Sequence, residues 1–372
     1  MKTKNVFNRV FFITAIIVIC CITFVWPCHG GEVDKIALEA YELRIQGKVD
    51  EAKTLLEQAI LENPNKAYAH YELARIQFHM ALGLGDYGKL SSMLGASQKS
   101  INKAVALEPQ NIIYHLFAGR LYFTQAYYGL MTGKKSEEQF TKAIRAYKTA
   151  LDIKPDYPQA ALYLVELYSQ FPEDAGGNKS EAEQYAKQLE EMDNVFAAKA
   201  RSVLLPQETD KVEYWHKVLK KHKGNADVFE ELGKAYLGAE NVDDAVSCFE
   251  KAIKTDPKKV YLFLDLSIYY TFQGMRARNN KELLETSIEK GDAALTRYID
   301  SNPIQPMRAY ALGARSKYKS FSGRTKEAQA LVKEAIMLDP YFSKATGAPD
   351  PDLFFAPPGE ISQRHRYLMR PF

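Results

Sequence analysis

Two glycine-rich stretches are the first places in this chain where residue type and spacing could support chemistry. Residues 83–88, GLGDYG, have the G-x-G-x-x-G spacing with which a loop between a strand and a helix holds a pyrophosphate. The residues before this stretch, YELARIQFHMAL, have a helical pattern, so the strand that such a loop requires is missing. We interpret residues 83–88 as the tip of a hairpin between two helices.

The second stretch, GLMTGKKS at residues 129–136, has the composition of a phosphate-binding loop. Its two glycines are separated by three residues, whereas that loop requires four, and no strand is predicted before it. The spacing therefore does not support a nucleotide site, and we expect no cofactor.

The spacing of histidine and cysteine does not suggest a metal centre or a nucleophile. The chain has no H-x-x-x-H pair and no Cys-x-x-Cys pair, and His216 and His222 would lie on different faces of a helix. Cys248 is the only cysteine after residue 30, so it has no partner for a disulfide within that part of the chain. We expect neither a bound metal nor catalysis.

Length and composition indicate a folded chain that is larger than one compact core. The chain has 372 residues, of which 46% are hydrophobic and 26% charged, and its mean hydropathy of −0.32 is too low for several membrane spans. Three of its 49 basic residues precede the first acidic residue, Glu32, so the remaining 46 basic residues balance 46 acidic ones. Without excess positive charge in the body of the chain, nucleic acid is not an expected partner.

The first 30 residues have the features of an export signal. A basic start is followed by residues 10–26, VFFITAIIVICCITFVW, which carry no charge and end at Pro27. We favour a cleaved signal peptide over an uncleaved N-terminal anchor, because Pro27 breaks the helix and Gly30 is small enough for a peptidase site. Either form places the body outside the cytoplasm, in the periplasm or elsewhere in the envelope. An uncleaved segment would be its only contact with a membrane.

Cleavage after Gly30 predicts a mature chain that begins at Gly31. Mass spectrometry of the N-terminal peptide of the protein isolated from its cells will test this start. An intact N-terminus found in the membrane fraction would show instead that the segment is an uncleaved anchor.

From residue 34 onward, the sequence repeats a unit of helix, turn and helix. The clearest unit is ADVFEELGKAYLGAENVDDAVSCFEKAIKTDP, residues 226–257. Two antiparallel helices approach closely only where small residues meet at their crossing, and a proline ends the second helix. Large residues, small residues and a proline recur at fixed positions of this unit. Positions 4, 7, 8, 11, 20, 24, 27 and 32 are occupied by Phe229, Leu232, Gly233, Tyr236, Ala245, Phe249, Ala252 and Pro257.

These residues resemble the tetratricopeptide repeat. The resemblance extends over residues 33–340 as about eight units, and it implies an all-α fold, a right-handed superhelical solenoid of helix-turn-helix repeats. Three units, residues 67–109, 112–155 and 260–303, are 11 or 12 residues longer than usual. The extra residues fall between the two helices of a pair, so we expect enlarged hairpins. Residues 197–224 are an irregular unit, in which Pro206 should end the first helix early.

The resemblance also implies a concave groove lined by unit positions 2, 5, 9, 12 and 13. Aromatic residues in such a groove bury a large area at a small entropic cost, and arginine pairs with carboxylates. The alternative is that neighbouring helices bury these rings as ordinary core. The predicted groove residues are Tyr41, Arg44, Tyr68, Tyr71, Arg75, Phe78, Arg120, Phe123, Tyr261, Phe272, Tyr310 and Tyr318.

Residues 341–372 form a proline-rich tail that does not continue the repeat. We expect the tail to cap the apolar end of the last repeat; the alternative is a peptide for a partner or for the groove of a neighbouring copy. Near residue 178, Ser180 and Glu183 predict a capping box.

The sequence therefore predicts a non-enzymatic interaction module or assembly scaffold of a bacterial envelope, with a protein or peptide partner in its groove. The alternative is a periplasmic carrier of a small ligand that serves solute uptake. The sequence leaves the oligomeric state open.

Overall fold

The structure is a computed structural model that describes residues 35–83, 87–171, 173, 176–277, 279–345 and 355–360. The chain divides into two units, Met1–Val33 and Asp34–Phe372, and all of the described residues belong to the second. The predicted export signal, residues 1–30, lies outside the described residues. None of the helices in the described ranges has the length and hydropathy needed to cross a membrane.

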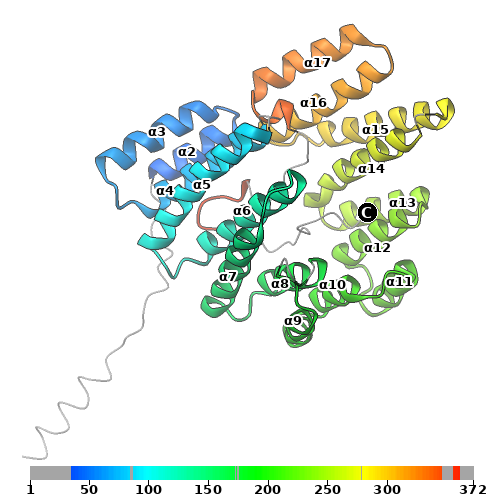
Figure 1. Cartoon of the computed structure of the whole chain (residues 1–372). Helices are drawn as coiled ribbons and strands as arrows, with labels where there is room; N and C mark the ends of the chain where they lie inside the picture. The colour runs from blue at the N-terminus through cyan, green and yellow to red at the C-terminus, as the bar shows by residue number, and fades with distance from the viewer. Residues whose placement is uncertain are drawn as a thin grey trace, which may run out of the picture. The chain divides into compact units, whose positions relative to one another are not determined.

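The described part of the chain is all-α, as expected, and contains no strand (Figure 1). Consecutive helices pack as antiparallel pairs that follow one another along the chain, which confirms the predicted solenoid of helix pairs. The helices are α2 (Lys35–Ile45), α3 (Val49–Glu62), α4 (Ala67–Gly83), α5 (Tyr87–Leu107), α6 (Ile112–Met131), α7 (Glu137–Ile153), α8 (Pro158–Gln170), α9 (Lys179–Met192), α10 (Asn194–Leu204), α11 (Lys211–Lys221), α12 (Ala226–Gly238), α13 (Val242–Thr255), η2 (Pro257–Tyr261), α14 (Leu262–Arg276), α15 (Lys281–Asp300), α16 (Gln305–Phe321), α17 (Thr325–Leu338) and η3 (Phe342–Lys344).

Glycines stand where the two helices of a pair cross, as the repeat pattern predicts. A Cβ atom added at Gly233 of α12 would lie 2.5 Å from the Phe249 ring of α13 and 3.2 Å from the Ala245 carbonyl. In the pair α6 and α7, a Cβ atom at Gly119 would lie 2.7 Å from the Tyr147 ring. An aromatic ring therefore fills the space that a side chain at the glycine would need.

The extra residues in the three long units lengthen the helices themselves. Helices α4 and α5 have 17 and 21 residues, α6 and α7 have 20 and 17, and α14 and α15 have 15 and 20. The regular pair α12 and α13 has only 13 and 14 residues. The predicted enlargement of these three hairpins is confirmed.

The irregular unit contains α10 and α11, and these two helices barely touch each other. Helix α10 ends at Leu204, just before Pro206, which cannot donate a helical hydrogen bond. It packs against α8 and α9, whereas α11 packs against α12. The two helices therefore belong to opposite neighbours, and they leave a pocket between them.

The predicted capping box at Ser180 is wrong. Helix α9 begins at Lys179, two residues before the start that a cap at Ser180 implies, and the Asn178 side chain accepts a hydrogen bond from the Glu181 backbone N–H at 3.1 Å. Asparagine is an equally good N-cap residue, and it comes first along the chain.

The first and last repeats of the Asp34–Phe372 unit lie in contact. The turn at Gly47, between α2 and α3, lies against the Leu338 carbonyl at the end of α17. The end of α4 at Gly83 lies against the backbone of Tyr341, and η3 packs against α4, α16 and α17. Residues 341–345 therefore lie on the last repeat and also join it to the second.

This closing contact predicts that Gly83→Ala destabilises the protein. The new methyl group would overlap the Tyr341 backbone, and such overpacking costs about 1–3 kcal/mol. The matched control is Gly95→Ala on α5, where no atom lies within 4 Å of the added Cβ and helix propensity favours alanine by about 1 kcal/mol. Urea unfolding should show opposite shifts of the midpoint for the two variants. A similar midpoint for both would mean that the contact at Gly83 contributes no stability.

Candidate functional site

The most elaborate cluster of predicted groove residues lies on α2 and α4, where two arginines pair with one buried carboxylate. Arg75 Nη1 donates to Glu72 Oε1 at 2.7 Å, and Arg44 Nη2 lies 3.6 Å from Glu72 Oε2. All three side chains are fully buried. Burial and the neighbouring Arg75 charge lower the pKa of Arg44 to about 9, from a usual value of 12.5. Only a specific set of partners makes such a buried cluster tolerable.

This cluster holds a piece of the chain's own C-terminal tail. The Tyr41 hydroxyl donates to the Phe355 carbonyl at 2.9 Å, and Arg75 Nη2 donates to the next carbonyl, that of Ala356, at 2.8 Å. The Arg44 guanidinium carbon lies 5.2 Å from the centre of the Phe355 ring, within the range of a cation–π contact. We call Tyr41, Arg44, Glu72, Arg75 and His79 the N-terminal groove site.

His79 connects this site to the closing contact between the first and last repeats. Its Nε2 lies 2.7 Å from Asp339 Oδ2, and its ring stacks on Phe342 at 3.9 Å and meets the edge of Phe355 at 5.8 Å. Burial lowers the pKa of His79, although the Asp339 carboxylate opposes that shift. A neutral imidazole therefore donates its Nε2 proton to the carboxylate, which as an anion can only accept.

The aromatic groove residues of α4 pack against the next first helix, α6. Tyr71 lies 4.9 Å from Tyr114 and 5.7 Å from Phe117, measured between ring centres, and Phe78 lies 5.8 Å from Phe117. Tyr68 is half-buried, and burial raises its pKa to about 12, so that it stays neutral. These rings mainly hold two repeats together.

Further along the chain, Arg120 and Phe123 also face their neighbours. The Arg120 guanidinium lies 5.5 Å from the centre of the Tyr163 ring on α8. Phe123 packs against Phe140 of α7 at 6.4 Å and against Phe171 at 6.2 Å. Both groups are at least nine-tenths buried.

The remaining predicted residues lie on α14, α16 and η2. The Tyr261 hydroxyl donates to Glu230 Oε2 at 2.8 Å, and the Tyr318 hydroxyl donates to the Ser267 carbonyl at 2.6 Å. Tyr310 is buried, whereas Phe272 is 50% exposed. Of the twelve predicted residues, only Phe272 is exposed and only Tyr41 and Tyr68 are half-buried. Most of the set therefore packs repeats together, and its binding role stays a prediction.

A second cluster, which the sequence reasoning missed, lies on α12 and the helices beside it. Lys259 Nζ donates to Glu230 Oε2 at 2.6 Å and to Asp227 Oδ1 at 2.8 Å, and Lys234 Nζ donates to Glu230 Oε1 at 2.6 Å. Lys234 also donates to Glu231 Oε1 at 3.1 Å. We call these residues, together with Lys199 of α10, which lies 3.8 Å from Glu231, the central charged cluster.

The sequence did contain a signal for the central charged cluster. Asp227, Glu230 and Lys234 occupy positions 2, 5 and 9 of the unit 226–257, the same positions that predict groove residues in other units. The contribution of Lys259 could not be seen in this way, because it lies after the end of that unit and reaches back to α12 only in the folded chain.

Mutual pairing keeps the central charged cluster ionised. Burial opposes ionisation of Glu230, but the charges of Lys234 and Lys259 hold its pKa well below the usual range. The pKa of Lys234 is raised for the converse reason, because the charges of Glu230 and Glu231 outweigh its burial. Neutralising any one member would leave a buried charge without its partner.

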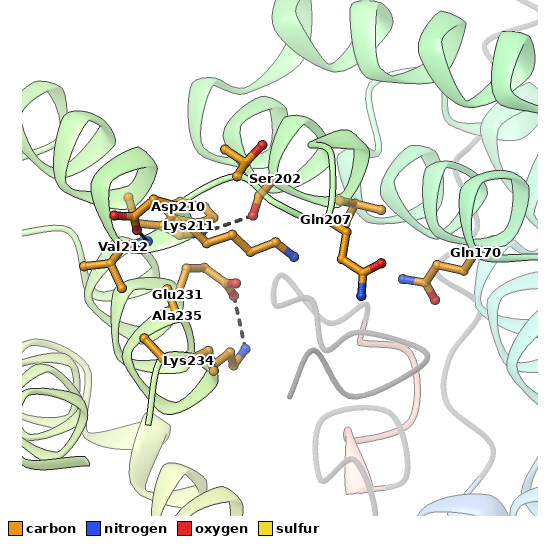
Figure 2. Close-up of a pocket in the computed structure, with 14 residues that line it drawn as sticks. Gln170, Ser202, Gln207, Asp210, Lys211, Val212, Glu231, Lys234 and Ala235 are labelled. Carbon is orange, nitrogen blue, oxygen red and sulfur yellow. Dashed lines mark hydrogen bonds and ion pairs between the residues drawn. The ribbon is translucent and has the colours of Figure 1, made fainter. Parts of the chain in front are cut away.

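A pocket of about 480 Å³ opens beside this cluster, between α10, α11 and α12 (Figure 2). Trp215 and the paired side chains of Glu231 and Lys234 line it, and the carboxamides of Gln170 and Gln207 point toward it (Figure 2). The volume lies within the range of small-molecule sites. The lining is too polar for the sealed apolar channel that a carrier of apolar ligands would need.

Loss of one lysine from the central charged cluster should destabilise the fold. Lys259→Met leaves Glu230 and Asp227 short of a partner, and breaking a buried pair costs about 3–5 kcal/mol. The control is Lys258→Met in the same turn, where the side chain is exposed and the effect should stay within about 0.5 kcal/mol. Thermal unfolding followed by circular dichroism measures both. Equal melting temperatures would mean that the cluster does not stabilise the repeat array.

Comparison with known proteins agrees with this arrangement of helix pairs. Two models of the tetratricopeptide repeat match the chain, over residues 38–80 and 226–259. Tetratricopeptide repeat protein 37 of Xenopus laevis is 22% identical over 316 residues, which cover 83% of this chain. The chain is a tetratricopeptide repeat protein. It spans 18% of the length of that relative.

Solved structures also resemble this tetratricopeptide repeat protein, at low identity. A tetratricopeptide repeat protein from Parabacteroides merdae is 16% identical with a TM-score of 0.40, over 81% of this chain and 98% of that one. A human IFIT1 dimer with PPP-AAAA is 16% identical with a TM-score of 0.37, over 85% of this chain and 70% of that one. Tetratricopeptide repeat proteins are typically non-enzymatic interaction modules, so the fold supports a protein–protein interaction scaffold.

Proposed function

We propose that this tetratricopeptide repeat protein is a non-enzymatic binding module of a bacterial envelope, and that its concave face captures a protein or peptide partner. The supporting observation is the pair of hydrogen bonds from Tyr41 and Arg75 to two successive backbone carbonyls, with an aromatic ring beside Arg44. Backbone carbonyls are common to every peptide. A site that already binds two of them therefore has the chemistry that peptide capture requires.

The envelope setting is a part of this proposal that rests on the sequence of residues 1–30. The proposed partner is a protein rather than nucleic acid, because basic and acidic residues are balanced beyond that segment.

Site-specific photo-crosslinking in cells tests the proposal without removing buried arginines, whose loss would disturb the fold. A photoreactive phenylalanine analogue is placed at half-buried Tyr41 or at Phe272, and the control position is Leu61 on α3, which is 84% exposed. We expect a discrete protein adduct from the two concave positions and none from Leu61. Mass spectrometry identifies the adduct, and purified partner should then bind the unmodified protein but bind a Tyr41→Ala variant at least ten-fold more weakly. An adduct from Leu61 alone would place the interface on another face.

The second candidate, a carrier of a small ligand, is favoured by the pocket beside the central charged cluster. Its Glu231 and Lys234 side chains offer opposite charges, and Trp215 offers an apolar wall, which suits a small zwitterionic solute better than an apolar one. Native mass spectrometry of the isolated protein would reveal such a solute. A bound solute without adducts from Tyr41 and Phe272 would favour the carrier over the scaffold.

A further inference from the structure

The C-terminal tail is attached to the repeats in two places. Near its start, the backbone of Ser343 lies against Gly313 of α16, and the Asp339 carboxylate accepts the hydrogen bond from His79 Nε2–H. Further on, residues 355–360 reach the N-terminal groove site, where Phe355 is 7% exposed. The first attachment fixes the point at which the tail leaves the last repeat. It therefore keeps residues 355–360 close to the N-terminal groove site, where they make the second attachment.

Phe355 lies among side chains from both ends of the repeat array. Its ring lies 5.2 Å from the Arg44 guanidinium carbon, 5.8 Å from the His79 ring and 5.7 Å from Phe342. It is therefore enclosed by a cation and two rings, which is a recognition environment for an aromatic side chain. A smaller side chain at this position would leave the space unfilled.

The residues after Phe355 direct its backbone toward the groove. Proline disfavours the helical conformation in the residue before it, so Ala356 and Pro357 are not helical, and the carbonyls of Phe355 and Ala356 accept from Tyr41 and Arg75. Pro358 is buried and Pro357 is exposed. The groove thus contacts one aromatic ring and two carbonyls.

We propose that residues 355–358 are an internal ligand of the N-terminal groove site, and that a partner binds there by displacing them. This inference rests on the proposed function, because it names the chemistry of the partner: a segment with an aromatic residue, then a small residue, then prolines. A tethered ligand acts at an effective concentration of the order of mM. A free peptide with the same intrinsic affinity must therefore reach about that concentration to displace half of the tail.

The test uses the full mature chain and a fluorescein-labelled synthetic peptide with the sequence of residues 350–360. Phe355→Ala in the protein removes the tail's own ring, so fluorescence polarisation should show the peptide binding this variant at least ten-fold more tightly than the wild type. The same change at exposed Phe321, which is 74% exposed on α16, is the matched control and should leave peptide affinity unchanged. A peptide in which the phenylalanine of position 355 is replaced by alanine should bind neither protein.

A second variant tests the groove side of the contact. In the Phe355→Ala background, Tyr41→Phe removes only the hydroxyl that donates to the Phe355 carbonyl and should weaken peptide binding by about three- to ten-fold. Tyr122→Phe, which removes an exposed hydroxyl bonded to Asn102, should have no effect. Circular dichroism checks that every variant keeps its helical content.

Equal peptide affinity for the wild type and Phe355→Ala would overturn the proposal, and so would the absence of binding to a variant that is still helical. Neither result would contradict the scaffold function, which is judged by crosslinking. A partner adduct at Phe272 that forms equally in the wild type and in Phe355→Ala would preserve the scaffold and reject competition by the tail. No adduct in either protein would reject the scaffold itself.

Discussion

The structure depends on close approach between helices, which is possible only where one side contributes almost no side chain. Tyr147 lies over Gly119, Phe249 over Gly233 and Tyr318 over Gly291, so an aromatic ring occupies the position of a missing Cβ. At Gly83 and Gly313, the backbone of the tail takes the place of the ring. Each crossing brings two helices near enough for their larger residues to interlock, and this packing is repeated from pair to pair.

The same dense packing explains why most of the predicted groove residues are buried. First helices of successive repeats lie side by side, and a large residue on one, such as Tyr71, fills the gap to the next, at Tyr114 and Phe117. These side chains are therefore buried between neighbouring helices. The polar members of the set stay charged by pairing: Arg44 and Arg75 with Glu72, and Lys234 and Lys259 with Glu230.

Two regions differ from this regular packing, and each carries a candidate for binding. At α10 and α11 the pair is split between different neighbours, and a charged pocket opens. At the N-terminal groove site, the gap between the first and last repeats is filled by Phe342 and Phe355 from the tail instead of by a further helix. Both candidates arise where the repeats do not complete their own packing, and it is at these places that we propose binding.

The sequence by itself determined the local structure. Helix pairs are specified by small residues at the crossings, by prolines after the second helices and by the length of the three longer units. These signals could be interpreted because each acts within about 40 residues of the chain. The sequence also indicated which positions of each unit line the predicted groove. Applying those positions to the unit 226–257 as well would have identified Glu230 and Lys234. Only the tertiary structure decided what those positions touch. The pairing of His79 with Asp339 joins residues 260 positions apart, and the bond from Tyr41 to Phe355 spans 314. Contacts at such separations depend on the sum of small rotations between repeats, which no single unit encodes.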